Sequence, residues 1–208
     1  MARCHTAGNA VADTLRKDRA THIVSLASGP AIELKQMLEQ LPPLEQPVEL
    51  TLVDVDEQAI QYAYDSLSRA IQGREDGHLI RLSCLNFSIG QIMTPVDEDE
   101  RRLVQDVLEN ADLIYSMGLF DYLNRAVAVR LLRRLYSLLA PGGRLFIGNL
   151  KRARDCSWAM DYAVHWQLIY RTQADMIELG ERMREPEANI EVTEDPTGYC
   201  MFLDVRRP

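Results

Sequence analysis

The sequence lacks any long apolar run. No stretch of its 208 residues approaches the roughly 18 consecutive apolar residues of a membrane-spanning helix. The first residues, Met1 to His5, lead into no apolar segment of the kind found in signal peptides. We therefore expect a cytoplasmic protein with no membrane span.

The sequence also lacks cysteine pairs with metal-ligand spacing. Its four cysteines, Cys4, Cys84, Cys156 and Cys200, are far apart, and no grouping of acids, histidines and cysteines has ligand spacing. In a reducing compartment such cysteines are buried or incidental free thiols. We predict free thiols and no metal site.

A positive net charge is absent as well. The value of −8 argues against general nucleic-acid binding. The charges are uneven: seven acids stand against two arginines in 97–112, and eight basic residues with no acid follow in 122–154. Such runs are usually solvated helix faces. The alternative is a basic rim that attracts an anionic substrate or an acidic carrier protein.

What the sequence does contain is an alternation of strand and helix patterns, long enough to bury one substantial core. Five alternations predict a parallel sheet covered on both faces. We expect a helical segment in 1–20, with a helix around Asn9 to Arg19, and one domain over 21–208. An opening strand around Ile23 and Val24 precedes the other predicted strands, 48–54, 79–85, 111–116 and 144–149. The predicted helices are 31–40, 57–71, 97–109 and 125–139.

Two details and the last third of the chain complete this prediction. Asp56 is placed to cap the helix 57–71, whose apolar face we take to include Tyr64. Helices are expected near 157–166 and over 172–183. Strands 190–193 and 199–205, joined by a turn at 195–198, predict an antiparallel hairpin added to the parallel sheet.

The stretch from Ser25 to Ala31 joins the opening strand to a helix through small residues. In an open parallel sheet such a turn lets backbone and a helix N-terminus approach a nucleotide, although an ordinary connection is the alternative. Asp54 lies at the end of the second strand, 25 residues after Gly29. In a nucleotide-binding sheet, a carboxylate at this position accepts hydrogen bonds from two ribose hydroxyls. A capping role for Asp54 is the alternative, but Asp56 is the better cap.

These residues resemble the class I S-adenosylmethionine-dependent methyltransferases over about residues 20 to 206. The likeness consists of Ser25-x-Ala-x-Gly-x-Ala31, Leu52-Val-Asp-Val-Asp56, Asn86-Phe87, Asp112-Leu-Ile-Tyr-Ser116 and Leu139-Ala-Pro-Gly-Gly143. It implies a Rossmann-like α/β fold, with a mostly parallel seven-stranded sheet in the order 3-2-1-4-5-7-6 that ends in the hairpin. The implied cofactor is S-adenosyl-L-methionine.

A narrower likeness involves residues 25–33, 114–123, 143–149 and 165–172. They are similar to bacterial methyltransferases of the biosynthesis of extracellular factor 3-hydroxypalmitic acid methyl ester. That resemblance implies methyl transfer to the carboxylate of a hydroxy fatty acid. Members usually carry an additional N-terminal region that this chain largely lacks.

The resemblance also assigns cofactor-binding residues. Gly29 and its neighbours would face the methionine part, Asp54 the ribose, and Asn86 with Phe87 the adenine. The loop keeps one glycine of three, so a positive φ at Ala27 would cost about 1 kcal/mol. Asn86 stands where an aspartate is common, and a turn asparagine is the alternative. The predicted cofactor-binding residues are Ser25, Ala27, Ser28, Gly29, Asp54, Val55, Asp56, Asn86, Phe87, Ser116, Met117 and Gly118.

Catalytic residues are expected where ligands bind, over the carboxyl ends of the strands. A sulfonium methyl is already activated, so holding the acceptor in line is the main requirement, and a carboxylate acceptor needs no base. Arg171 could pair with an acyl carboxylate or hold the following helix, and His165 could be a base or a core histidine. The predicted catalytic residues are Tyr115, Asn149, His165 and Arg171.

Two other functions remain open from the sequence. An NAD-dependent oxidoreductase would need a fuller glycine fingerprint. A non-catalytic module that binds the cofactor or a protein partner is favoured by the glycine-poor loop. Our preferred prediction is a methyltransferase that acts on a small or lipid-like acceptor, with a fatty-acyl carboxylate as the first candidate.

Overall fold

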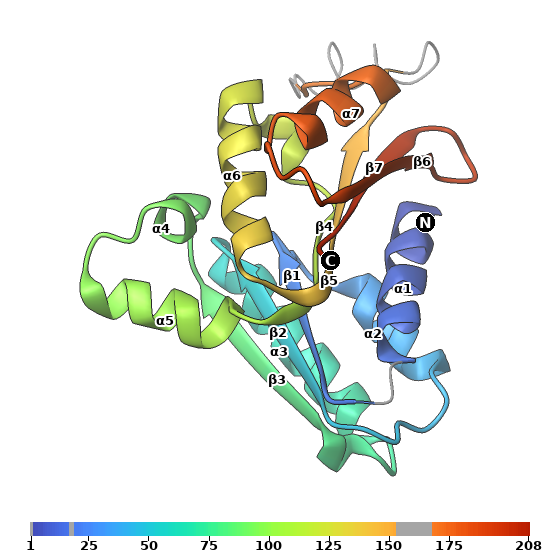
Figure 1. Ribbon diagram of the computed structural model, residues 1–208. Coiled ribbons are helices and arrows are strands. Elements are labelled where there is room, and N and C mark those ends of the chain that lie inside the picture. The colour runs from blue at the N-terminus through green and yellow to red at the C-terminus, as the bar shows by residue number, and fades with distance from the viewer. Residues whose placement is uncertain (1, 17–18, 153–167) are drawn as a thin grey trace.

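The computed structural model describes residues 2–16, 19–152 and 168–208, and their strands form one seven-stranded sheet (Figure 1). The order is β3-β2-β1-β4-β5-β7-β6, which confirms the order implied by the resemblance. Neighbours among β1 to β5 are parallel, whereas β7 runs antiparallel to both β5 and β6. The strands are β1 (Thr21–Leu26), β2 (Val48–Asp54), β3 (Ile80–Asn86), β4 (Ala111–Ser116), β5 (Leu139–Leu150), β6 (Asn189–Glu194) and β7 (Cys200–Arg206).

Helices cover both faces of this sheet, and each face has its own apolar core (Figure 1). One core contains side chains from α1, α2 and α3, and the other contains side chains from α4, α5, α6 and α7. This is the three-layer α/β arrangement that the alternation predicts. The helices are α1 (Ala2–Leu15), α2 (Ile32–Gln40), α3 (Glu57–Gln72), α4 (Ile89–Met93), α5 (Glu98–Leu108), α6 (Arg125–Ser137) and α7 (Gln173–Glu181), with short 3₁₀ turns η1 (Gly77–Leu79) and η2 (Phe120–Tyr122).

Polar side chains determine where several helices begin. The Asp56 carboxylate accepts the backbone N–H groups of Gln58 and Ala59, which confirms its predicted capping role. Thr172 caps α7 in a reciprocal box with Asp175. Because these caps satisfy otherwise unpaired N–H groups, the beginnings of α3 and α7 are well specified by the sequence.

Three local expectations are wrong. The first helix begins at Ala2 and ends at Leu15, earlier than the predicted 9–19. The helix α4 was not predicted, although Ser88 and Gln91 form a capping box at its start. Tyr64 is 46% exposed and not in the core, because α3 turns Ala63 and Leu67 toward the sheet.

Other expectations concern absences or residues without a described structure. The expected helix at 157–166 lies outside the described residues. In the described part of the chain, no helix is long and apolar enough to cross a membrane. The described cysteines, Cys4, Cys84 and Cys200, are free, and burial raises the pKa of the Cys200 thiol to about 12.

Candidate functional site

The parallel strands bring the predicted ligand-binding residues to one edge of the sheet. Asp54 and Asn86, at the ends of β2 and β3, are direct register partners. Ser25 of β1 pairs in register with Tyr115 of β4. In open α/β sheets, the carboxyl ends of strands are where ligands bind. The candidate site is therefore this edge, from β3 through β2 and β1 to β4.

The loop after β1 has an unusual backbone. Ala27, Gly29 and Ala31 all adopt positive φ angles, of 52°, 50° and 47°. The left-handed region is strained for alanine by about 1 kcal/mol per residue. The loop thus keeps, with two alanines, the conformation that glycines would adopt without strain. No atom lies within 4 Å of a Cβ built on Gly29, so the loop is open there.

Asp54 links the loop to the start of α3. Its Oδ2 atom accepts the Gly29 backbone N–H at 2.7 Å, and its Oδ1 atom accepts the Asp56 N–H at 3.0 Å. The side chain is half-buried and is not turned into the core. A carboxylate has about four lone-pair sites, so each oxygen can accept a further hydrogen bond. This geometry is suited to holding a pair of hydroxyl groups.

The next polar group along the edge is the amide of Asn86. Its Nδ2 atom donates to the Asp54 backbone carbonyl at 3.0 Å, which directs Oδ1 away from that contact. In the described residues, no group donates to this oxygen, and the side chain is exposed. Phe87 packs against the adjacent core, while Val55 is 64% exposed. A hydrogen-bond acceptor such as Asn86 Oδ1, next to exposed apolar surface, fits the polar edge of an aromatic base.

At the end of β4, Ser116 provides an orphan polar atom. Its Oγ atom is the one buried side-chain N or O atom of the described residues that has no hydrogen-bond partner. The residue is 1% exposed. An unsatisfied hydroxyl costs free energy unless a ligand or water completes it. Met117 and Gly118 follow directly and are half-buried. The carboxyl edge therefore fits a polar ligand.

Tyr115, a predicted catalytic residue, is 1% exposed and lies on the other side of β4 from Ser116. Its hydroxyl donates to Glu33 Oε1 at 2.9 Å and also interacts with the Ser25 side chain. Burial raises the pKa of the Glu33 carboxyl. Burial also raises the pKa of the Tyr115 hydroxyl, to well above its usual range. These contacts favour a supporting role, and a catalytic role for Tyr115 stays a prediction.

Asn149 and Arg171 bond to each other. Arg171 Nη1 donates to Asn149 Oδ1 and to the Phe120 carbonyl, and Nη2 donates to the Leu123 carbonyl. The Asn149 amide donates to the Ile169 carbonyl at 3.0 Å. Burial lowers the pKa of the Arg171 guanidinium. Because these groups are buried and already bonded, the geometry favours a framework role, and their catalytic role stays a prediction.

His165, the fourth predicted catalytic residue, lies outside the described residues. Two charged residues near the site were not predicted: Arg3 of α1 and Glu33 of α2. Glu33 had a usable signal, because it lies one turn before Met37 on the apolar face of a helix. Arg3 had none, because contact between α1 and the sheet edge depends on the tertiary fold.

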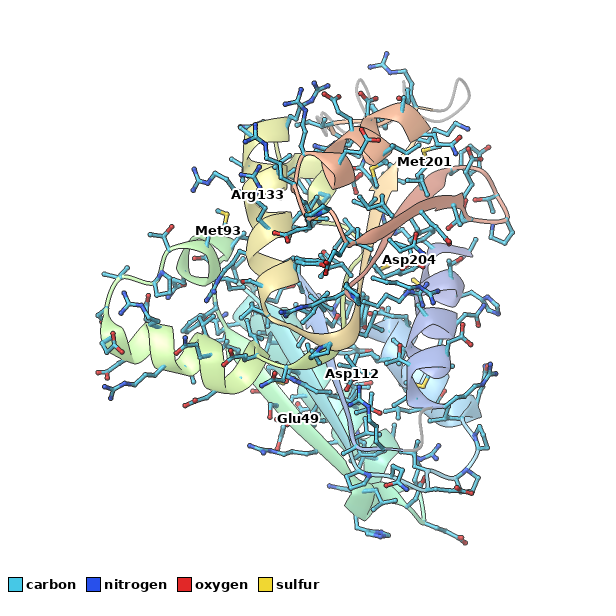
Figure 2. All side chains as sticks on the ribbon, viewed as in Figure 1. Glu49, Met93, Asp112, Arg133, Met201 and Asp204 are labelled. Carbon is cyan, nitrogen blue, oxygen red and sulfur yellow. The ribbon has the colours of Figure 1, made fainter. Side chains whose placement is uncertain are left out.

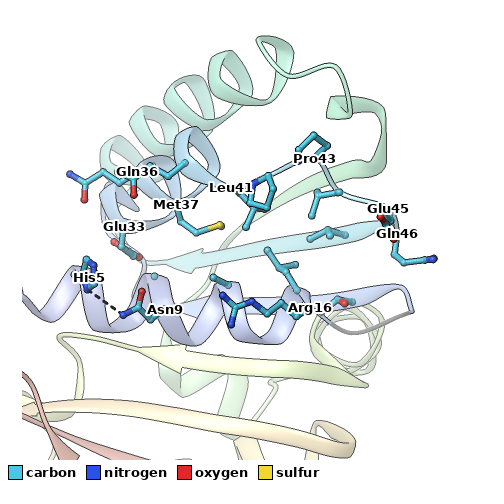
Figure 3. Close-up of a pocket in the computed structure, with 18 of the residues that line it drawn as sticks. His5, Asn9, Arg16, Glu33, Gln36, Met37, Leu41, Pro43, Glu45 and Gln46 are labelled. Carbon is cyan, nitrogen blue, oxygen red and sulfur yellow. Dashed lines mark hydrogen bonds between the residues drawn. The ribbon is translucent and has the colours of Figure 1, made fainter.

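A groove of about 580 Å³ lies between α1 and α2 (Figure 3). Its lining mixes polar and charged side chains with apolar ones, among them Leu15, Met37, Leu41 and Leu44. Glu33 and His5 lie toward one end of the groove. The volume is in the range of small-molecule sites. None of the predicted cofactor-binding residues lines it. The groove is therefore a separate feature that begins near the candidate site.

The basic run of the sequence is mostly occupied by internal contacts. Arg133 donates to two carbonyls after α7, and Arg134 donates to the Ile92 carbonyl (Figure 2). Arg144 forms a bidentate pair with Asp204, at 2.8 and 2.7 Å. These contacts favour the interpretation that the arginines of this run hold the fold or face solvent. They disfavour a basic rim that attracts an anionic substrate. Among the described residues, no cluster of three or more His, Cys, Asp or Glu could hold a metal.

Sequence comparison finds no relative: no protein-family model and no curated protein matches the chain. Solved structures do match. A possible exported protein from Bordetella parapertussis has a TM-score of 0.70 at 20% identity, over 99% of this chain and 67% of its own. The mitomycin 7-O-methyltransferase MmcR has a TM-score of 0.64 at 18% identity, over 98% of this chain and 53% of its own.

A third structure was solved with a nucleoside ligand. The magnesium protoporphyrin IX methyltransferase ChlM from Synechocystis PCC 6803, with bound S-adenosylhomocysteine, has a TM-score of 0.64 at 10% identity. The match covers 99% of this chain and 84% of ChlM. Similarity at this level of identity shows the fold alone. The chain has the Rossmann-like fold of S-adenosylmethionine-dependent methyltransferases.

Proposed function

We propose that the chain is an S-adenosylmethionine-dependent methyltransferase that acts on a small or lipid-like acceptor. The observation that carries the proposal is the Asp54 carboxylate, held at the sheet edge by Gly29 and Asp56. Its remaining lone pairs can accept two ribose hydroxyls. The Asn86 oxygen can accept the adenine amino group, and the Ser116 hydroxyl offers a buried polar contact.

The work of the protein is then to hold two molecules in line. When bound, the donor supplies a methyl group already activated by its positively charged sulfur. The acceptor oxygen forms a new C–O bond as the S–C bond breaks, leaving a neutral thioether. If the acceptor is a carboxylate, no proton has to move and no general base is required. Proximity and orientation supply the catalysis.

We propose a hydroxy fatty acid carboxylate as the first acceptor to test. The resemblance to the methyl ester biosynthesis family suggests it, and the apolar side chains that line part of the α1–α2 groove support a lipid-like molecule. Glu33, at one end of that groove, lies two residues after Ala31, the last residue of the loop that follows β1. An acyl chain in the groove would thus begin beside the candidate donor site.

Thermal unfolding with three ligands tests the donor. A ligand at 100 times its Kd adds about 2.7 kcal/mol of stability, which is about 5 to 10 °C for a chain of this size. We expect S-adenosylmethionine and S-adenosylhomocysteine to raise the melting temperature and NAD to leave it unchanged. Stabilisation by NAD alone would contradict the proposal. No response to any of the three would favour the interaction module.

Methyl transfer from radiolabelled donor tests the acceptor. A long-chain 3-hydroxy fatty acid should gain label as a base-labile ester, while its methyl ester should gain none because its carboxylate is blocked. Label on both compounds would indicate a hydroxyl acceptor. Donor binding without label on either would remove the fatty acid proposal and leave the donor assignment intact.

A further inference from the structure

The first turn of α1 places a guanidinium at the candidate site. A Cβ built on Gly118 would lie 3.7 Å from Arg3 Nη2, so this cation lies against the segment that follows β4. The Arg3 side chain is 35% exposed. Its nearest described carboxylate oxygen is Asp121 Oδ2, 3.8 Å from Nη1. That distance allows attraction but not a hydrogen bond. The guanidinium donors of Arg3 therefore have no hydrogen-bonded partner among the described residues.

The first turn of α2 places a carboxyl group nearby. Glu33 is 9% exposed, and one oxygen accepts the Tyr115 hydroxyl at 2.9 Å. The positive charge of Arg3 acts on this carboxyl and partly offsets the effect of burial on its pKa. Glu33 also lines the end of the groove, so it is accessible from one side. A buried acid without a close cationic partner is costly in an apo protein.

Two opposite charges thus flank the sheet edge on the α1–α2 side. The loop that precedes Glu33 ends at Ala31, and the segment that contacts Arg3 begins at Ser116, whose hydroxyl is unpaired. S-adenosylmethionine has two chemically different ends. The nucleoside end matches Asp54 and Asn86, and the amino acid end carries an ammonium and a carboxylate.

We propose, on the basis of the proposed function, that Arg3 and Glu33 together recognise the amino acid end of the donor. Arg3 binds the carboxylate through its forked donors, and Glu33 binds the ammonium. This assigns α1 a direct part in ligand binding.

Isothermal titration with two ligands tests the assignment. S-adenosylhomocysteine carries the amino acid end, whereas 5′-methylthioadenosine has the same nucleoside without it. The variants are Arg3→Gln and Glu33→Gln. The matched control is Arg16→Gln. Arg16 directly follows the same helix, its side chain is 79% exposed, and it pairs with Asp13. Each apo variant is first checked by thermal unfolding.

We expect each of the two variants to weaken S-adenosylhomocysteine binding about tenfold or more, since a charge-assisted hydrogen bond is lost. Binding of 5′-methylthioadenosine should stay within about twofold of wild type in all variants. The control should leave both affinities unchanged. If Arg3→Gln does not fold, Arg3→Lys replaces it, and loss of the fork should still weaken S-adenosylhomocysteine alone.

Two results would overturn the assignment, and a third would overturn the function on which it rests. Unchanged S-adenosylhomocysteine affinity in either variant would remove that residue from the site while leaving the proposed function in place. An equal loss for both ligands would mean that the substitution disturbs the nucleoside end and not the amino acid contact. Failure of the wild-type protein to bind either ligand would instead contradict the proposed function itself.

Discussion

The two halves of the sheet edge differ in how their polar side chains are used. In the β2–β3 half, Asp54 and Asn86 each make bonds to the backbone and keep acceptor capacity toward solvent. In the β5 half, Asn149 and Arg171 are buried and bond to each other and to carbonyls. The comparison teaches that an asparagine at a strand end can keep its side-chain oxygen unbonded within the described part of the chain, as Asn86 does, or use it to hold the framework, as Asn149 does.

Substitution of Arg171 should have the largest effect on stability, because it removes the buried hydrogen bonds of the β5 half. Arg171→Met leaves Asn149 Oδ1 and two carbonyls without their donor. We expect a loss of about 3 kcal/mol in the free energy of unfolding, measured in urea. The control Arg125→Met, whose side chain is 55% exposed, should cost less than about 1 kcal/mol. Equal effects would contradict the framework role.

Substitution of Asp54 should affect ligand binding more than stability. Asp54→Ala removes the acceptor proposed for two ribose hydroxyls, so S-adenosylhomocysteine affinity should fall about 30-fold, or about 2 kcal/mol. Calorimetry measures the change. Asp97→Ala is the control, because it removes an exposed carboxylate that caps α5 and is not among the predicted site residues. Unchanged affinity in Asp54→Ala would remove the ribose assignment.

Relief of backbone strain in the loop after β1 should have a smaller effect, and it should raise stability where the Arg171 substitution lowers it. At Ala27 the φ angle is 52°, so Ala27→Gly should raise the free energy of unfolding by about 1 kcal/mol. Ala12→Gly, in the last turn of α1, should lower it by up to about 1 kcal/mol. Urea unfolding of both variants checks the signs. A loss of stability in Ala27→Gly would contradict the left-handed backbone of the loop.

The pH dependence of stability gives the smallest effect. Burial raises the pKa of Glu33 above its ordinary value of 4.5. The stability that this carboxyl contributes is therefore full below pH 4.5 and is lost as the pH rises through the folded-state pKa. Relative to wild type, Glu33→Gln should gain stability over that rise. Glu39→Gln, which removes an exposed carboxylate on the same helix, is the control. A parallel pH profile for Glu33→Gln and wild type would contradict the prediction.

The sequence predicts most of the fold because local signals agree with the tertiary structure. The bounds of β2 and β4 are as expected, since most residues of each strand are apolar and buried. The α1 prediction fails because its buried face consists largely of small residues, such as Ala7 and Ala10, which give little apolar contrast. The five-residue helix α4 is too short for periodicity to reveal.

The candidate site is less predictable from sequence. Residues at strand ends are found because topology alone brings them to one edge, as for Asp54 and Asn86. Whether a side chain there is free or bonded depends on partners distant in sequence, such as Arg171 for Asn149. Arg3 reaches the edge only through the packing of α1. Such contacts have no local signature.

A crystal structure with S-adenosylhomocysteine is the most direct test of the central claim. The account predicts both ribose hydroxyls within hydrogen-bond distance of the Asp54 carboxylate, with the adenine beside Asn86. A ligand bound in the α1–α2 groove, with Asp54 contacting only Gly29 and Asp56, would contradict it.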